Sequence, residues 1–459
     1  MTTAPKKKLG IWMLTALVAG NMIGSGVFLL PASLASIGSI SLISWVLTSI
    51  GAFFLGMVFV YLSRMMPKTG GPYAYAHAGF GQFIGFQTAY SYWIQLWIGN
   101  AAIVVAMIGY LEVFFPELSG NVPARLMLAI SIVWLLTLIN AAGVREAGVV
   151  QLVTTILKLI PLGFVAFFGW FFIDSSNYFG ANVNVTQDPV LSNYSAISMA
   201  GTLTLWAYIG LESATVPADS VENPQRNIPR ATIIGILIAA VIYIAGTAAI
   251  FGIIPNAELQ ASTSPYADAA GVILSHFNLP GINPGEWGRW IIAVGAIISC
   301  FGCLNGWTLL QAQVPRAAAD DHLFPKFFSK LNSRGVPVYG LIFTSVLISG
   351  LLLLTADEAL VRQFEMIILL AVLSSLVPYM FTSISLLILR KRFDQKNVFQ
   401  VVVSLVACAY VLWAIFSAGA ELLYLGCMIF FSCVPLYGIF LARRAAATTE
   451  TTVMPLEKV

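Results

Sequence analysis

Residues 20–31 form a glycine-rich stretch, GNMIGSGVFLLP, inside an apolar run that has no charged residue between Lys8 and Arg64. A glycine in a helix interior costs about 1 kcal/mol relative to alanine. If the helix is interrupted at residues 24–26, the half-helix that begins near Val27 directs free N–H groups and a positive dipole end into the apolar interior. These amides form an anion site without a cationic side chain, and a carboxylate suits it. The alternative is a packing face of small residues between helices.

A second interruption is predicted in residues 203–231, where the letters YIGLES bring Gly210 and the charged Glu212 about midway into an apolar span. A carboxylate inside a span costs about 2.5–3.5 kcal/mol on insertion scales and seldom lacks a role. In one large class of transporters, spans one and six are corresponding, broken members of a five-helix inverted repeat. One break can offer amides to a carboxylate and the other can offer carbonyls to an ammonium group. An amino acid carries both groups.

Lys158, in TTILKLIPLG, lies deep in a further apolar stretch. Burial disfavours the charged form of a lysine, so this side chain could gain and lose a proton as water access alternates. The alternative is a permanently charged lysine that bonds to carbonyls of the broken first helix.

The remaining chemistry-bearing residues form no recognisable catalytic or metal-binding pattern. Cys300 and Cys303 match a C-x-x-C spacing, but neither a second pair nor a histidine lies nearby in the sequence, so packing between helices is the better interpretation. The three histidines form no ligand pattern, and the sequence has no nucleotide cradle or nucleophile elbow. We therefore expect no enzyme activity, no catalytic residue, no cofactor and no metal.

These residues lie in a chain whose composition is that of a membrane protein. Hydrophobic residues make up 59% of the 459 residues and charged residues only 9%, with a mean hydropathy of +0.87; soluble domains carry about 25% charged residues. Since about 20 apolar residues span a bilayer, we expect about twelve membrane-spanning helices and no soluble domain. The predicted spans are 11–37, 40–63, 85–111, 126–143, 148–172, 196–217, 231–254, 290–313, 337–355, 366–389, 399–417 and 422–441.

The distribution of basic residues supports this division. Nineteen lysines and arginines fall on one side of the predicted membrane, and three (Arg125, Arg289 and Arg362) fall on the other. The remaining one of the 23, Lys158, lies inside a predicted span. The positive-inside rule makes both termini cytoplasmic. The basic N-terminus does not predict a signal peptide, because its apolar continuation forms a full span. The tail after Arg444 is expected to be disordered.

Several motifs together resemble the amino acid–polyamine–organocation superfamily, and within it the bacterial basic amino acid/polyamine antiporters of the arginine–agmatine group. The motifs are GNMIGSGVFLLPASLASIG, GGPYAYA, WIGN, LWAYIGLESA, ENPQRNIPRAT, GWTLL, AAADDHLFPKFF and LVPYMFT. The resemblance implies an all-α polytopic membrane protein with a five-plus-five inverted repeat (LeuT-like), in which helices 1 and 6 are broken. The repeats would be residues 1–172 and 196–390, followed by two additional helices (391–443) and a cytoplasmic tail (444–459).

The resemblance also implies roles for individual residues. The α-carboxylate of the substrate would be held by the first break, at Asn21, Ile23, Ser25 and Gly26. The α-amino group and stem would meet Trp206 and Ile209, and the distal amine or guanidinium would meet Trp307. Asn100 would line the same pocket, and Tyr73 and Glu212 would act in cytoplasmic gating and the pH response. Each assignment has an alternative: the tryptophans could be packing or interfacial aromatics, and Asn100 could bond across helices.

The sequence departs from the antiporters at two places. Gln95 and Leu96 replace small residues on the face of the third span that approaches the substrate tail, which suggests a different or shorter substrate. Lys158 stands where these antiporters carry an apolar residue. Proton-coupled members of the superfamily carry a lysine in a similar setting, near the ion site of sodium-dependent relatives.

We therefore expect secondary amino acid transport by alternating access in the bacterial inner membrane. The substrate is expected to be a cationic amino acid, exchanged for its decarboxylated amine or another amino acid. Proton symport through Lys158 is the alternative. A non-transporting amino acid sensor is a less favoured alternative, because such a sensor would be expected to carry a signalling domain and none is recognised in this sequence. A channel is less favoured still, because the sequence has no filter motif. The expected partners are the substrate and the lipid bilayer, with a homodimer as an option and no nucleic acid.

Overall fold

The computed structural model describes residues 9–141, 147–186, 193–218, 221–277, 283–333 and 335–453. Over these ranges the chain is helical and forms no strand, apart from one isolated bridge between Leu9 and Val221. The α-helices are α1 (Ile11–Met22), α2 (Ser25–Ala35), α3 (Ser41–Met65), α4 (Pro72–Phe80), α5 (Gln82–Leu111), α6 (Val122–Ala141), α7 (Ala147–Gly163), α8 (Asn193–Trp206), α9 (Pro224–Ile253), α10 (Asn256–Ala261), α11 (Pro265–Ser275), α12 (Pro284–Asp320), α13 (Val338–Leu354), α14 (Leu360–Arg392), α15 (Phe399–Ser417) and α16 (Ala420–Val453).

Short helices of other types fill several connections. A π-helical turn at Phe164–Phe168 follows α7, which has Pro161 in its last turn. The 3-10 helices lie at Pro116–Leu118, Gly169–Phe172, Ser175–Tyr178, Gly180–Asn182, Ser213–Thr215 and Lys326–Ser329.

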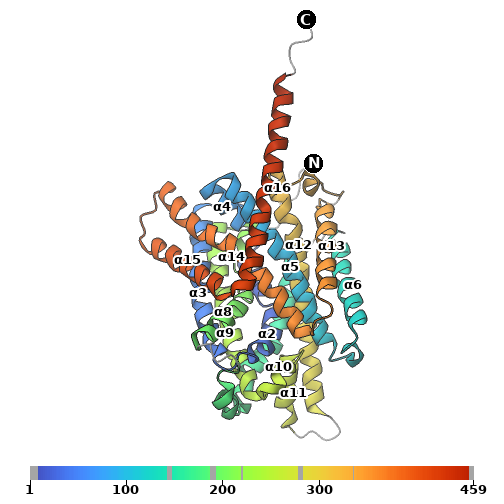
Figure 1. Ribbon diagram of the computed structural model, residues 1–459. Helices are drawn as coiled ribbons and strands as arrows, with labels where there is room; N and C mark the ends of the chain where they lie inside the picture. The colour runs from blue at the N-terminus through green and yellow to red at the C-terminus, as the bar shows by residue number, and fades with distance from the viewer. Residues whose placement is uncertain are drawn as a thin grey trace.

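The helices form a polytopic membrane bundle (Figure 1). Within the described ranges, ten segments are long and apolar enough to cross a bilayer, with α1 and α2 counted as one span. The remaining two predicted spans correspond to α13, a shorter apolar helix, and to α8 with the residues that follow it. The prediction of an all-helical, multi-pass membrane protein is therefore confirmed.

Three short helices were not predicted. Each is much shorter than the stretch of about 20 apolar residues from which the spans were predicted. Figure 1 shows α4 at one end of the bundle and α10 and α11 at the opposite end, so they cover the ends of the spanning helices.

The expectation of a disordered tail after Arg444 is wrong as far as Val453, because α16 continues to that residue and extends beyond the bundle in Figure 1. The letters ARRAAA contain strong helix formers, which favour continuation of the helix into water. Residues 454–459 lie outside the described ranges.

Both predicted helix interruptions are present. The first span leaves the helical conformation at Ile23 and Gly24, and α2 resumes at Ser25, slightly earlier than the predicted start near Val27. The sixth span ends as α8 at Trp206, and turns occupy residues 207–212 before the next 3-10 helix.

The centre of the bundle is formed around α5. This helix packs against α12 and α14, and it also contacts α2 and α4. Of the residues in the most apolar stretch of α5, 89% are buried inside the protein, whereas only 6% are buried in the most apolar stretch of α16. The interior of the protein is therefore centred on α5, whereas α16 lies at its outside.

Candidate functional site

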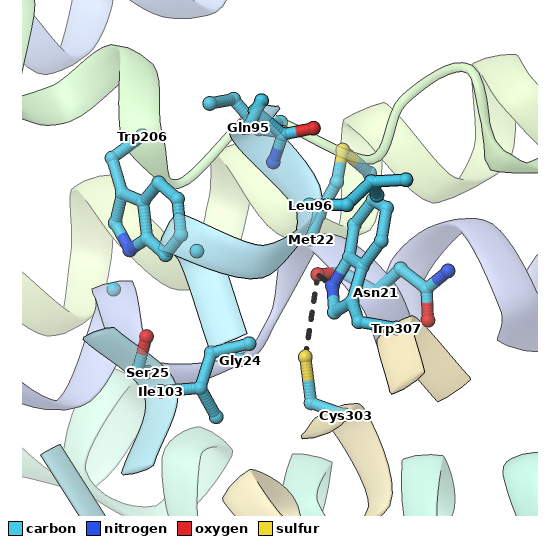
Figure 2. Close-up of a pocket in the computed structure, with 13 residues that line it drawn as sticks. Asn21, Met22, Gly24, Ser25, Gln95, Leu96, Ile103, Trp206, Cys303 and Trp307 are labelled. Atoms are coloured by element: carbon cyan, nitrogen blue, oxygen red, sulfur yellow. Dashed lines mark hydrogen bonds between the residues drawn. The ribbon is translucent and has the colours of Figure 1, made fainter. Parts of the chain in front are cut away.

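A pocket lies where the two interrupted helices face α5 and α12 (Figure 2). The described residues that line it are Asn21, Met22, Gly24, Ser25, Gly26, Gln95, Leu96, Gly99, Ile103, Trp206, Ile209, Cys303 and Trp307. None of these is acidic or basic, so the pocket presents amides, a hydroxyl, a thiol and aromatic rings to a ligand.

The two helix breaks touch one another at this pocket. Asn21 Nδ2 at the end of α1 donates to Ser213 Oγ, beyond the second break, at 2.9 Å. Gly210 has φ +113°, a conformation that favours glycine, and a Cβ added there would lie 3.2 Å from the Asn21 backbone carbon. The two interruptions therefore meet in the fold.

The first turn of α2 faces this space without a side-chain cap. Gly24 is the N-cap residue, so no N-cap side chain bonds to the amides that follow it. The first amides of a helix lack intrahelical acceptors and carry the positive end of the dipole. The start of α2, at Ser25 and Gly26, thus has the properties of an anion site.

Trp206 forms one wall of the pocket and needs two glycines to fit. A Cβ added at Gly26 would lie 2.9 Å from Trp206 Cδ1, and one added at Gly99 would lie 2.9 Å from Trp206 Cη2. The indole therefore extends from the start of α2 to the middle of α5. Trp307 stands on another side of the pocket (Figure 2), and its Nε1 donates to the Asn21 carbonyl at 3.4 Å.

Two buried polar atoms of the pocket have no hydrogen-bond partner among the described residues. They are Ser25 Oγ, in a residue that is 1% exposed, and Gln95 Oε1, in a residue that is 2% exposed. An unsatisfied buried donor or acceptor costs about 1–3 kcal/mol. Both atoms are therefore candidates for contact with a polar ligand.

Lys158 lies behind the first break rather than in the pocket. It is fully buried, and its Nζ donates to the carbonyl oxygens of Gly20 and Ile23, both at 2.8 Å. Ser299 Oγ donates to the same Ile23 carbonyl at 3.4 Å. These are carbonyls that lose helical partners where α1 ends, so the ammonium group stabilises the interrupted backbone.

Glu212 is also fully buried, on the other side of the second break. Its Oε1 accepts from Tyr92 of α5 at 2.8 Å, and its Oε2 accepts from Tyr379 of α14 at 2.9 Å and from the Gly210 amide at 3.2 Å. The four ion pairs found within the described ranges involve neither Glu212 nor Lys158. Neutral donors therefore hold this carboxylate and connect the broken helix to α5 and α14.

Comparison with known proteins identifies the family. A model described as amino acid permease matches residues 9–454. The chain belongs to the amino acid permease family. The match also confirms the predicted membership of the amino acid–polyamine–organocation superfamily.

This permease is similar to curated bacterial transporters over nearly its whole length. It is 36% identical over 442 residues to the putrescine transporter PotE of Haemophilus influenzae, covering 95% of this chain and 98% of that protein. It is 35% identical to the putrescine transporter PotE of Escherichia coli K12, covering 96% and 97% of the two chains. It is 34% identical to the cadaverine/lysine antiporter of Escherichia coli K12, covering 90% of each chain.

Tyr73 lies away from the pocket, on α4 at one end of the permease. Its hydroxyl donates to Asp321 Oδ2 at 2.5 Å, and its ring stacks on His77 at a centroid distance of 5.7 Å. Burial and the neighbouring Asp321 carboxylate raise the pKa of Tyr73 well above its usual value of 10. The hydroxyl therefore stays protonated near neutral pH and keeps a donor for the bond between α4 and the end of α12.

The structure brings only part of the predicted set to the pocket. Six predicted substrate-binding residues line it: Asn21, Ser25, Gly26, Trp206, Ile209 and Trp307. Ile23 and Asn100 do not. Ile23 directs its carbonyl to Lys158, and Asn100 Nδ2 donates to Gln311 Oε1 of α12 at 2.6 Å.

Other lining residues were not predicted as binding residues. Cys303 was interpreted as a packing residue, yet its thiol donates to the Asn21 carbonyl at 3.6 Å and borders the pocket (Figure 2). It lies four residues before Trp307 and therefore on the same helix face, a spacing that could have identified it. Gly99 likewise lies four residues from Gln95 on α5 and therefore on the same face of that helix. Within the described ranges, no group of three or more His, Cys, Asp or Glu residues could hold a metal ion.

Proposed function

We propose that this permease is a secondary active transporter that carries a cationic amino acid by alternating access. It exchanges this substrate for the decarboxylated amine or for another amino acid. The observation that carries the proposal is the pocket at the meeting point of two broken helices, where uncapped amides face two tryptophans. The similarity to a putrescine transporter and a cadaverine/lysine antiporter supports the substrate class.

In this proposal the two ends of the substrate meet different chemistry. The α-carboxylate binds at the amides of Ser25 and Gly26, beside Asn21. The α-amino group and the first carbons of the stem meet Trp206 and the turn that contains Ile209. The distal cation lies toward Trp307, because a cation above an indole face gains about 0.5–2 kcal/mol without an acidic partner.

Two predicted residues then act indirectly in this conformation. Ile23 contributes through its backbone, because its carbonyl holds Lys158 in place. Asn100 keeps its bond to Gln311 and reaches the substrate only if that bond breaks as α5 and α12 move.

Glu212 and Tyr73 are proposed as gating residues. The contacts of Glu212 with Tyr92 and Tyr379 join the broken sixth span to α5 and α14. The contact of Tyr73 with Asp321 joins α4 to the end of α12. Both sets of contacts cross between elements that must separate if the pocket opens to the cytoplasm.

Lys158 supports a second candidate, which is proton symport of an amino acid. Its Nζ donates to the carbonyls of Gly20 and Ile23, in the way that a bound cation would contact them. If Lys158 loses its proton during the cycle, those carbonyls lose their partner and the first break can rearrange. Substrate movement would then be coupled to proton movement.

The membrane placement follows from the charge distribution. We propose that the permease lies in the bacterial inner membrane with both termini cytoplasmic, because 19 of 23 basic residues fall on that predicted side. The repeats are proposed to be residues 1–172 and 196–390, with two additional helices at 391–443 and a cytoplasmic tail at 444–459. A homodimer would be formed by chains that each contain a whole pocket.

The function is tested with purified permease in proteoliposomes. Vesicles loaded with ornithine, lysine, arginine, putrescine, cadaverine or agmatine are assayed for uptake of each labelled compound, with and without a pH gradient. We expect exchange of one diamino acid for its amine without a gradient. Uptake that requires a pH gradient, with no exchange, would favour the symport candidate, and no uptake of any of these compounds would overturn the proposed substrate class.

A further inference from the structure

The carboxamide of Gln95 is the polar group of the pocket that the proposed function leaves without a role. Gln95 lies on α5, is 2% exposed and borders the pocket, yet its Oε1 has no hydrogen-bond partner among the described residues. A buried carbonyl oxygen left unpaired costs about as much as a lost hydrogen bond. The arrangement is therefore suited to a ligand that supplies a donor.

Gln95 lies at the end of the pocket away from the start of α2. A Cβ added at Gly99 would lie 2.9 Å from Trp206 Cη2 and 3.4 Å from Gln95 Nε2, so the carboxamide and the six-membered edge of the indole border the same space. The opposite edge of the indole, at Cδ1, approaches Gly26. A substrate lying along the indole with its carboxylate at Gly26 brings its distal end to Gln95.

We propose that Gln95 determines specificity by accepting a hydrogen bond from the distal amine of the substrate. This inference rests on the proposed function. The described lining residues include no acidic side chain, and Gln95 Oε1 is the one unpaired side-chain oxygen among them besides the hydroxyl of Ser25. A diamino acid or a diamine satisfies it, whereas an amino acid of equal length that ends in a methyl group leaves it unpaired.

The two exchanged compounds share the distal amine and differ only in the α-carboxylate. Decarboxylation removes the group that binds at the start of α2 and leaves the distal amine unchanged. Gln95 therefore contributes equally to binding of the amino acid and of its amine, whereas the α2 amides contribute to binding of the amino acid alone. This difference separates the role of Gln95 from that of Gly26.

The test compares ornithine with norleucine, in which a methyl group replaces the distal ammonium group. Binding is measured by thermal shift and by competition in proteoliposomes for the wild type, Gln95→Met and Gln95→Glu. A lost hydrogen bond to a charged group predicts that Gln95→Met binds both ornithine and putrescine about tenfold or more weakly, with norleucine binding unchanged. Gln95→Glu keeps the acceptor, adds a charge, and should bind both cationic compounds more tightly.

Gln87→Met is the matched control. Gln87 lies eight residues earlier on α5, is 1% exposed and does not border the pocket, so its replacement should leave the preference for ornithine over norleucine unchanged. The inference is overturned if Gln95→Met retains the wild-type preference, or if it fails to fold and Gln95→Glu leaves binding of ornithine and putrescine unchanged. Failure of the proposed function is separate, because then the wild type itself would exchange no diamino acid.

Discussion

Trp206 connects the two ends of the pocket through one rigid side chain. Its indole approaches Gly26 of α2 with one edge and Gly99 of α5 with the other. The same side chain lines the pocket between the two helix breaks. At the level of single residues, Trp206 is therefore the strongest candidate for direct contact with the substrate.

Trp206→Leu should reduce exchange at least tenfold while the protein still folds and reaches the membrane. The substitution removes the aromatic face on which the α-amino group and the substrate stem would lie, and a cation over an indole face gains about 0.5–2 kcal/mol. Uptake in proteoliposomes and melting temperature in detergent are the measurements. Trp290→Leu, on the exposed part of α12 beside Trp287, is the control. Near-normal uptake with near-normal affinity in Trp206→Leu would remove this residue from the site.

Lys158→Ala separates the two coupling schemes. If Lys158 titrates during transport, uptake driven by a pH gradient should disappear, while exchange without a gradient survives. If Lys158 is a fixed cation that stabilises the first break, exchange and gradient-driven uptake should fall together. Stability should then fall by a few kcal/mol, because hydrogen bonds to charged groups contribute about 1.5–3 kcal/mol each.

The measurement for Lys158→Ala is counterflow beside gradient-driven uptake in the same liposomes. Lys158→Arg is the companion variant, since it keeps the charge near the carbonyls of Gly20 and Ile23 but does not release a proton at working pH. If neither activity changes in Lys158→Ala, this residue has no transport role.

At the level of elements, the break between α1 and α2 depends on side chains from other helices. Lys158 binds the carbonyls of residues 20 and 23, and Trp307 and Cys303 bind the carbonyl of Asn21. The glycines alone were enough to predict an interruption. They were not enough to predict that α2 begins at Ser25, because partners that are distant in the sequence determine where α1 ends.

Gly26→Val tests the start of α2 as the carboxylate site. The new Cβ would lie 2.9 Å from Trp206 Cδ1 and 3.3 Å from the Cβ of Ala207, so the side chain would enter the space over the free amides. Binding of amino acids should weaken at least tenfold, with a smaller effect on the decarboxylated amine and a modest loss of melting temperature. If the wild type binds an amino acid and its amine equally well, the proposed carboxylate site is wrong.

The limits of sequence-based prediction follow from the length of each element. Long apolar runs predicted every spanning helix, because the bilayer requires about 20 apolar residues. The short helices α4, α10 and α11 have no comparable requirement. Side-chain orientation was harder still: Asn100 and Gln95 lie on the same helix, but the position of α12 turns Asn100 toward Gln311 while Gln95 borders the pocket.

At the level of the whole molecule, exchange of a diamino acid for its diamine moves charge. A diamino acid carries a net charge of about +1 at neutral pH and its diamine about +2, since only the amino acid has a carboxylate. One-for-one exchange therefore transfers one positive charge in the direction of the diamine. The membrane potential must then drive or oppose each turnover.

An inside-positive potential should accelerate uptake of the amino acid against internal diamine, and an inside-negative potential should slow it. One charge moved through 100 mV is worth about 2.3 kcal/mol, which is about a fiftyfold change in the accumulation ratio at equilibrium. The measurement is labelled ornithine uptake into putrescine-loaded liposomes with the potential set by a potassium gradient and valinomycin. Ornithine-for-ornithine exchange is the control, because it moves no net charge. The opposing outcome is ornithine-for-putrescine exchange that does not respond to the potential while the control runs normally. A compensating proton would then move in each cycle. The simple exchange scheme would be replaced by one in which Lys158 carries that proton.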